Sequence, residues 1–323
     1  MTLMFRRAVV ATLLLTGVGL PSAVRAQGSP QASGAVTLFE NVRIFDGKSA
    51  TLSAPSNVLV RGNKIETIST QPIAVDRRAD THIIDGGGRT LMPGLIDAHW
   101  HAMMVRVTPV QAFGDVGYNN LVAGAEATDT LMRGFTTVRD VGGPVFGLKS
   151  AIDEGIVKGP RIYPSGAVIT VTSGHGDFRQ LTDLPRTIGG MLARMEQLEV
   201  WPGIAKSYEL AKEYKLKTAW GTDVLFSAAL AKQQGAILAS LTRWYTPAEA
   251  LIMATSANAE LLALSGKRNP YPGKLGVVEQ GALADLLLVD GNPLENINLI
   301  ADPDKNFLVI MKDGVIYKNA MNR

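Results

Sequence analysis

The stretch Leu91–His101, LMPGLIDAHWH, decides the fold of this chain. It is apolar and suited to a β-strand, and the Pro-Gly pair at 93–94 is typical of a strand entry. Because side chains alternate along a strand, Asp97, His99 and His101 share one face. Two imidazoles at i and i+2 on a rigid strand can bind one metal ion from the same side. The alternative, two histidines in an ordinary buried strand, leaves the accompanying Pro-Gly entry and Asp unexplained.

The middle of the chain alternates between strand and helix patterns. Such alternation predicts an α/β barrel or a doubly wound sheet, with chemistry in the loops that follow the strands. Strand patterns begin at Leu91, Gly134, Pro160 and Leu216 and extend to His101, Val141, Thr172 and Asp223. Helical patterns cover 117–133, 145–154, 205–214 and 246–264, and the last opens on a capping box formed by Thr246 and Glu249, with Pro247 at the first helical position.

Both ends of the chain consist of short strand patterns with hairpin signals. Gly62-Asn63 and Asp313-Gly314 are the turn dipeptides. Neither end has enough strands to be stable alone. We therefore expect residues 36–90 and 267–323 to form one composite β-sandwich domain, beside a barrel domain at 91–266.

The first 26 residues have the pattern of a secretory signal peptide. Arg6 and Arg7 precede an apolar core, and the small-residue run Ala23–Ala26 precedes Gln27. Residues 27–35 form a polar linker. The pattern predicts a periplasmic or secreted protein, and no second apolar run is long enough to span a membrane.

Composition limits the possible partners and ligands. The chain has 32 basic and 29 acidic residues, and three arginines fall within the first 26 residues, so the remainder is formally neutral. Nothing in this balance indicates a nucleic-acid partner. The chain has no cysteine, so a metal site must use His, Asp, Glu or Lys ligands.

The segment PGLIDAHWH resembles the first barrel strand of the amidohydrolase superfamily, whose His-x-His pair holds a catalytic divalent metal. The resemblance implies that His99 and His101 are metal ligands and that zinc is the ion expected. Asp223 ends the strand pattern LKTAWGTD, where a carboxylate lies at the mouth of a barrel. It is either a helix N-cap or, as the resemblance implies, a further ligand and the general base that takes a proton from the attacking water.

Two further segments resemble the branch that contains imidazolonepropionase and the Xaa-Pro and Xaa-Arg dipeptidases: GFTTVRDVGG and SGHGDFR. The resemblance implies that His175, in the second segment, lies near the substrate; the alternative is a hydrogen bond that orders its loop. Arg139 and Asp140 are expected to form a structural ion pair. His82 is expected at the surface or in packing.

The ligand set of that family is incomplete in this chain. It has four histidines, His82, His99, His101 and His175, whereas the family pattern has two more after the fifth and sixth barrel strands. The family pattern also has a carboxylated Lys after the fourth strand. The lysines between Asp177 and Asp223 are Lys206, Lys212, Lys215 and Lys217, and none of them follows a strand pattern in the expected way.

The length of the barrel region agrees with this deficit. Residues 91–264 number 174, whereas a complete barrel needs roughly 250. The strand patterns match the first, second, third and eighth units of the family, so an internal deletion near 183–203 is expected.

These observations predict a metal-dependent amidohydrolase on an incomplete (β/α) barrel. It would hydrolyse a carbon–nitrogen bond in a small molecule, an amide, cyclic amide or dipeptide. The alternative is an inactive remnant or a binding protein of the same family. A third possibility is a homo-oligomer in which a partner copy supplies the missing strands.

Overall fold

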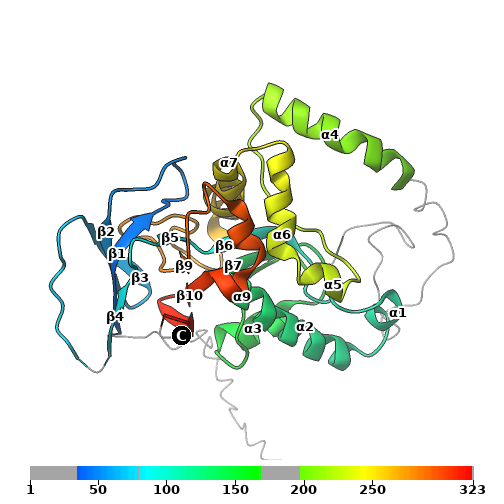
Figure 1. The fold of residues 1–323 in the computed structure, drawn as a ribbon. Helices are drawn as coiled ribbons and strands as arrows, with labels where there is room; N and C mark the ends of the chain where they lie inside the picture. Colours follow the sequence, from blue (N-terminus) through cyan, green and yellow to red (C-terminus); the bar gives the residue numbers. More distant parts are fainter. Residues whose placement is uncertain (1–34, 79, 167, 169–196, 322–323) are drawn as a thin grey trace, which may run out of the picture.

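The computed structural model describes residues 35–78, 80–166, 168 and 197–321. The expected signal peptide, His175 and most of the expected junction at 183–203 lie outside the described residues. Two β-sheets and the helices packed around them make up the described part (Figure 1).

The larger sheet combines strands from both ends of the chain. Its order is β11-β10-β9-β5-β1-β2-β3, with β4 paired in parallel to β1. The antiparallel pair β5–β9 joins the two ends, Leu91 lying opposite Leu288. The division into a composite sandwich and a barrel domain stays a prediction. The strands are β1 (Val36–Ile44), β2 (Ser56–Arg61), β3 (Lys64–Ser69), β4 (Thr81–Asp85), β5 (Thr90–Pro93), β9 (Leu286–Val289), β10 (Phe307–Lys312) and β11 (Val315–Asn319).

Both expected hairpin turns are confirmed. Gly62-Asn63 joins the antiparallel pair β2–β3, and Asp313-Gly314 joins β10–β11. Asp313 and Gly314 both have positive φ, which is the conformation of a type I′ turn. The two turns are also in contact: Asn63 Nδ2 donates a hydrogen bond to Asp313 Oδ1 at 3.1 Å.

The stretch that was expected to be one strand, 91–101, is divided between the two sheets. Its first part is β5 and its second part is β6 (Leu95–Trp100). Gly94 is the pivot: its amide donates to Asp285 O, and a Cβ there would lie 2.2 Å from Thr136 Oγ1. The Pro-Gly pair therefore marks a passage between sheets rather than a simple strand entry.

The smaller sheet is parallel and has the order β6-β7-β8. It includes β7 (Phe135–Asp140) and β8 (Arg161–Pro164), in agreement with the strands expected from Gly134 and Pro160. Helices α2 (Val116–Met132) and α3 (Phe146–Asp153) alternate with these strands. Trp100, Val138 and Ile162 pack with buried residues of both helices, which covers one face of the sheet.

The strand expected at 216–223 is not formed. The segment has no regular secondary structure and makes two backbone hydrogen bonds with β6, Ala98 N to Trp220 O and Asp223 N to His99 O. Lys215 before it and Asp223 at its end both have positive φ. These left-handed residues flank the segment and limit how far a ladder could extend in either direction.

The remaining helices lie mainly in the C-terminal half. The expected capping box is confirmed at the start of α7, where Thr246 and Glu249 exchange hydrogen bonds, and the helix continues through a π turn to α8. Helix α4 covers the expected helix 205–214 as far as Glu213. It projects from the body of the protein in Figure 1, and Tyr208 anchors it by stacking on Trp244. The bounds are α1 (Pro109–Ala112), α4 (Gln197–Glu213), α5 (Ala228–Ala231), α6 (Gln234–Ala239), η2 (Ser240–Arg243), α7 (Pro247–Ile252), η3 (Met253–Ala257), α8 (Asn258–Ala263), η4 (Gly266–Arg268), η5 (Ile297–Ala301) and α9 (Pro303–Asn306).

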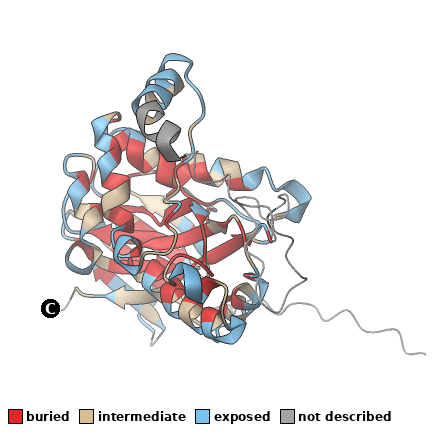
Figure 2. Cartoon of the chain, turned by 90° about the vertical axis from the view of Figure 1, so that its right-hand side faces the viewer, coloured by how far each residue is buried: buried red, intermediate tan, exposed pale blue. Residues whose placement is uncertain are grey.

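Buried residues gather on the strands and on the inward faces of the surrounding helices (Figure 2). The largest fully buried side chains include Trp100 and Phe135 from the smaller sheet and Phe39 and Phe307 from the larger one. Among the described residues, no helix is long and apolar enough to cross a membrane.

Candidate metal centre

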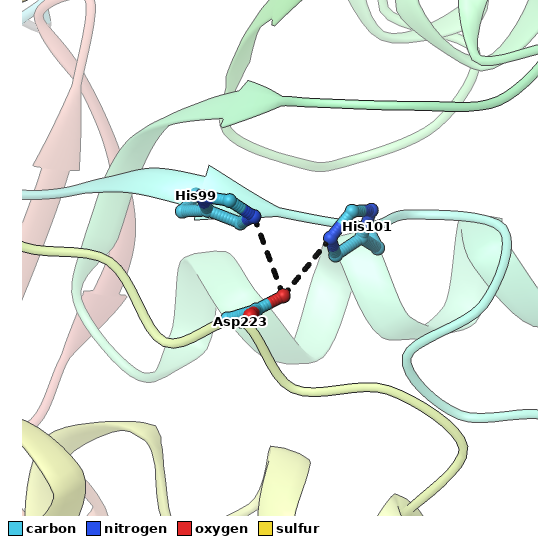
Figure 3. Close-up of side chains that lie close together, drawn as sticks. All are labelled: His99, His101 and Asp223. Carbon is cyan, nitrogen blue, oxygen red and sulfur yellow. Dashed lines mark hydrogen bonds and ion pairs between the residues drawn. The ribbon is translucent and has the colours of Figure 1, made fainter. Parts of the chain in front are cut away.

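The structure brings His99, His101 and Asp223 together. His99 lies on β6 and His101 follows it directly, while Asp223 ends the segment that runs beside β6 (Figure 3). Asp223 Oδ1 lies 3.3 Å from His99 Nε2 and 3.1 Å from His101 Nε2. One potential ligand atom from each residue lies within 4.8 Å of the other two.

Asp223 is held in this position by its backbone and by the neighbouring glycine. Its φ is 50°, a left-handed value that is unfavourable for a residue with a Cβ. Its amide donates a 2.9 Å hydrogen bond to His99 O. At Gly221 an added Cβ would lie 2.4 Å from His99 Cβ, so only glycine lets the segment approach β6 this closely.

The electrostatics of the centre favour an ionised carboxylate. Hydrogen bonds from His101 and then His99 hold the pKa of Asp223 well below its usual range, against the smaller opposing effect of burial. The side chains of His99 and Asp223 remain 46% and 61% exposed, whereas that of His101 is 10% exposed. The centre is thus accessible from one side.

The chemistry of these side chains fits a divalent metal. Imidazole nitrogen and carboxylate oxygen are ligands that zinc accepts, and three protein ligands with an open position is the usual number in a catalytic zinc site. Both Nε2 atoms point at the same carboxylate oxygen. His101 Nδ1 is buried and has no hydrogen-bond partner within the described part of the chain, so Nε2 is the nitrogen engaged at the centre.

Known proteins resemble this chain in sequence and in fold. A sequence model of the amidohydrolase family matches residues 90–214. The crystal structure of an amidohydrolase superposes with a TM-score of 0.73 and 22% identity, covering 88% of this chain and 99% of that one. A prolidase complexed with N-methylphosphonate-L-proline gives a TM-score of 0.73 and 21% identity, covering 88% of this chain and 100% of that one.

Residues 90–214 of this chain are therefore similar to the amidohydrolase family, and the fold is similar to that of solved amidohydrolases. The sequence of this chain is also 27% identical to the ochratoxinase of Aspergillus niger over 182 residues, which are 52% of this chain and 30% of that enzyme. The match therefore spans less than a third of the length of this curated relative.

A buried network of hydrogen bonds supports the centre. Asp97 has no exposed surface, and burial raises the pKa of its carboxyl group. It accepts hydrogen bonds from His99 N (3.0 Å), Thr222 N (3.1 Å), Thr222 Oγ1 (2.6 Å) and Gln234 Nε2 (2.8 Å). The shared face expected for Asp97, His99 and His101 thus contacts the 220–223 segment.

The expected ion pair between Arg139 and Asp140 is absent among the described residues. Neighbours on a strand point to opposite faces, and Asp140 instead accepts hydrogen bonds from Ala102 N (2.7 Å) and Gly142 N (3.2 Å). Burial raises the pKa of Asp140 to about 6. Its contact with Ala102 fixes the chain directly after His101.

The other candidate residues lie elsewhere. His82 is exposed on β4, as expected. His175 lies outside the described residues, so its role near the substrate stays a prediction. Lys206 pairs with Glu209 and Lys217 with Glu260, and Lys212 donates to Trp244 O. The sequence did not indicate Thr222 or Gln234 as part of the centre. Nothing in the local sequence shows that either side chain will donate a hydrogen bond to Asp97.

Proposed function

We propose that this chain is a metal-dependent hydrolase of the amidohydrolase superfamily that acts on carbon–nitrogen bonds in small molecules or dipeptides. The convergence of His99 Nε2 and His101 Nε2 on Asp223 Oδ1 carries the proposal. His99, His101 and Asp223 would hold a divalent metal, for which zinc is our candidate. When bound, the metal would lower the pKa of a water molecule and polarise the scissile carbonyl.

Asp223 would serve as ligand and general base. Like other aspartates, it is ionised at neutral pH, so its carboxylate can accept a proton from the attacking water at Oδ. It could then return this proton to the leaving nitrogen. His175 would contact the substrate. The similarity to a prolidase, an Xaa-Pro dipeptidase and an ochratoxinase suggests Xaa-Pro dipeptides and ochratoxins as first substrates to test.

We also propose that the barrel is incomplete. The parallel sheet β6-β7-β8 and the 216–223 segment beside β6 would correspond to the first, second, third and eighth units of a complete barrel, with the central units lost near 183–203. The strands from both ends, grouped as 36–90 with 267–323, would form the composite β-sandwich domain.

A second candidate function is an inactive remnant or a binding protein. It is supported by the incomplete ligand set, since no histidine follows His175, and by the exposure of His99 and Asp223. A homo-oligomer in which a second copy completes the barrel would reconcile such exposure with activity. In either case we propose a periplasmic or secreted location, with a mature chain that begins at Gln27.

The test is metal content paired with hydrolysis. The purified protein is expected to contain about one zinc per chain and to hydrolyse Xaa-Pro dipeptides or ochratoxin-type amides. His101→Ala should abolish both, whereas His82→Ala, which changes an exposed histidine on β4, should retain both. Zinc binding without hydrolysis would favour the binding protein. A metal-free chain, or His101→Ala that keeps its zinc, would refute the proposed centre.

A further inference from the structure

Asp223 depends on contacts from outside its own segment. The segment 216–223 has no regular secondary structure, and Asp223 has a left-handed backbone. A conformation of this kind is strained and persists only where the surroundings impose it. The two backbone hydrogen bonds between this segment and β6 are few to hold Asp223 in such a conformation.

Two buried amide side chains supply the missing constraint. Asn258, on α8, brackets Trp220: its Oδ1 accepts from Trp220 N at 2.9 Å, and its Nδ2 donates to Trp220 O and Ile96 O. Closer to the metal centre, Gln234 at the start of α6 donates from Nε2 to Asp97 Oδ2, and the same oxygen accepts from Thr222 Oγ1. Asp97 therefore ties Gln234 to the residue directly before Asp223.

The orientation of the Gln234 amide is fixed from its far side. Arg133, at the end of α2, donates from Nε to Gln234 Oε1 at 3.1 Å, so the nitrogen of the amide must face Asp97. Arg133 is itself paired with Glu126 and donates to Thr130 Oγ1 at 2.9 Å. Gln234 is 2% exposed and Glu126 is 2% exposed, so solvent does not replace these partners.

We propose that Gln234 is a positioning residue that, through Asp97 and Thr222, holds Asp223 against His99 and His101. This inference rests on the proposed function, because holding Asp223 in place serves catalysis only where Asp223 is a metal ligand and general base. The amide of Gln234 meets the requirement, since it accepts from Arg133 and donates to Asp97 at once. A leucine would do neither.

The test uses the full-length chain without metal, so that it does not depend on activity. Thr222→Val removes one hydroxyl, and Gln234→Leu removes the amide. Hydrogen–deuterium exchange of residues 216–226, measured relative to the β9 amides, is expected to speed up roughly fivefold in Thr222→Val and more in Gln234→Leu. Thr222→Ser keeps the hydroxyl and should restore the slow exchange.

Asn119→Leu is the matched control. Asn119 is a buried amide on α2 that donates to Ala112 O and lies outside the network, so its loss should not accelerate the 216–226 segment relative to β9. Unchanged exchange of this segment in both Thr222→Val and Gln234→Leu would overturn the inference.

Zinc titration of the same variants separates this inference from the proposed function. Thr222→Val and Gln234→Leu should bind zinc about 10- to 100-fold more weakly than the parent, as is usual when residues that orient ligands are lost, and Thr222→Ser should bind it normally. Parent-like zinc affinity in both would also count against positioning. If the parent binds no zinc, the proposed function fails, while the exchange result still decides whether Gln234 holds Asp223.

Discussion

Asp223 is joined to His99 twice, through its amide to the carbonyl oxygen at 2.9 Å and through Oδ1 to Nε2 at 3.3 Å. The first contact fixes the distance between the two backbones and the second fixes the side chains. A metal centre built this way tolerates little displacement of the 220–223 segment, because a shift of the backbone moves the carboxylate away from both imidazoles.

Gly221→Ala is expected to disturb the centre for this reason. The added Cβ would lie 2.4 Å from His99 Cβ and 2.6 Å from His99 N, so the segment must move away from β6. Zinc affinity should fall by about tenfold or more. Gly147→Ala on α3, where an added Cβ meets nothing within 4 Å, is the control and should leave zinc binding unchanged. Zinc titration with a chelating indicator measures both, and equal affinities would contradict the prediction.

A buried ion pair at the first residue of β8 links the two sheets. Arg161 is 3% exposed and pairs with Asp285, which is 4% exposed, and Arg161 Nη2 lies 2.6 Å from Asp313 Oδ1. Arg161→Leu would leave Asp285 buried without its hydrogen-bonded ion-pair partner and should lower the free energy of unfolding by about 3–5 kcal/mol. Urea denaturation measures this change.

An exposed ion pair provides the comparison. Lys217 and Glu260 pair at 2.9 Å with side chains 91% and 65% exposed. Lys217→Ala should produce no measurable change in the midpoint of denaturation, because solvent screens such a pair. If Arg161→Leu unfolded at the same urea concentration as Lys217→Ala, the buried pair would not stabilise the join between the sheets.

Lys312 should make stability depend on pH in the alkaline range. Burial, followed by the nearby Arg161 charge, lowers the pKa of Lys312 to about 8, from a usual value of 10.5. Between these values the unfolded chain binds more protons than the folded one, so this group adds stability as pH rises from about 8 to 10.5. The gain amounts to about 3 kcal/mol, since each pKa unit corresponds to about 1.4 kcal/mol.

Lys312→Met removes that contribution and isolates it from other alkaline titrations. The difference in unfolding free energy between the parent and Lys312→Met should shift in favour of the parent as pH rises through this range. Urea denaturation of both proteins at pH 7.5, 9 and 10.5 checks the slope. A difference that stays constant with pH would show that Lys312 titrates alike in the folded and unfolded chains.

Local signals in the sequence predicted the elements that local chemistry determines. The turns at Gly62-Asn63 and Asp313-Gly314 and the capping box at Thr246 depend on residues close in sequence, and the structure has them where expected. The convergence of His99, His101 and Asp223 required more, namely the resemblance to a family. Spacing alone could not place a residue so distant in sequence against β6.

The differences arise where one segment passes close to another. Gly94 lies where the chain passes from one sheet into the other, and it must be glycine because Thr136 leaves no room for a side chain. The strand pattern at 216–223 does not form a strand: left-handed residues flank the segment, which makes two backbone hydrogen bonds with β6. Gln234 acquires its role from Arg133 and Asp97, which lie far from it in sequence. Such tertiary contacts leave no pattern in the sequence.

Zinc is expected to stabilise the folded chain. The metal would join β6 to the 220–223 segment, and a ligand that binds only the folded state at about 100 times its Kd adds about 2.7 kcal/mol. Thermal and urea denaturation with and without zinc measure this gain. Asp223→Asn, which keeps the shape of the side chain but removes its charge, should lose most of it.

His82→Ala should retain the full gain, because this exposed histidine lies on β4 away from the centre. The comparison also tests the inactive-remnant alternative. A remnant whose centre no longer binds metal would melt identically with and without zinc in the parent, Asp223→Asn and His82→Ala. A gain lost in His82→Ala but kept in Asp223→Asn would place the metal elsewhere on the protein and refute the role assigned to Asp223.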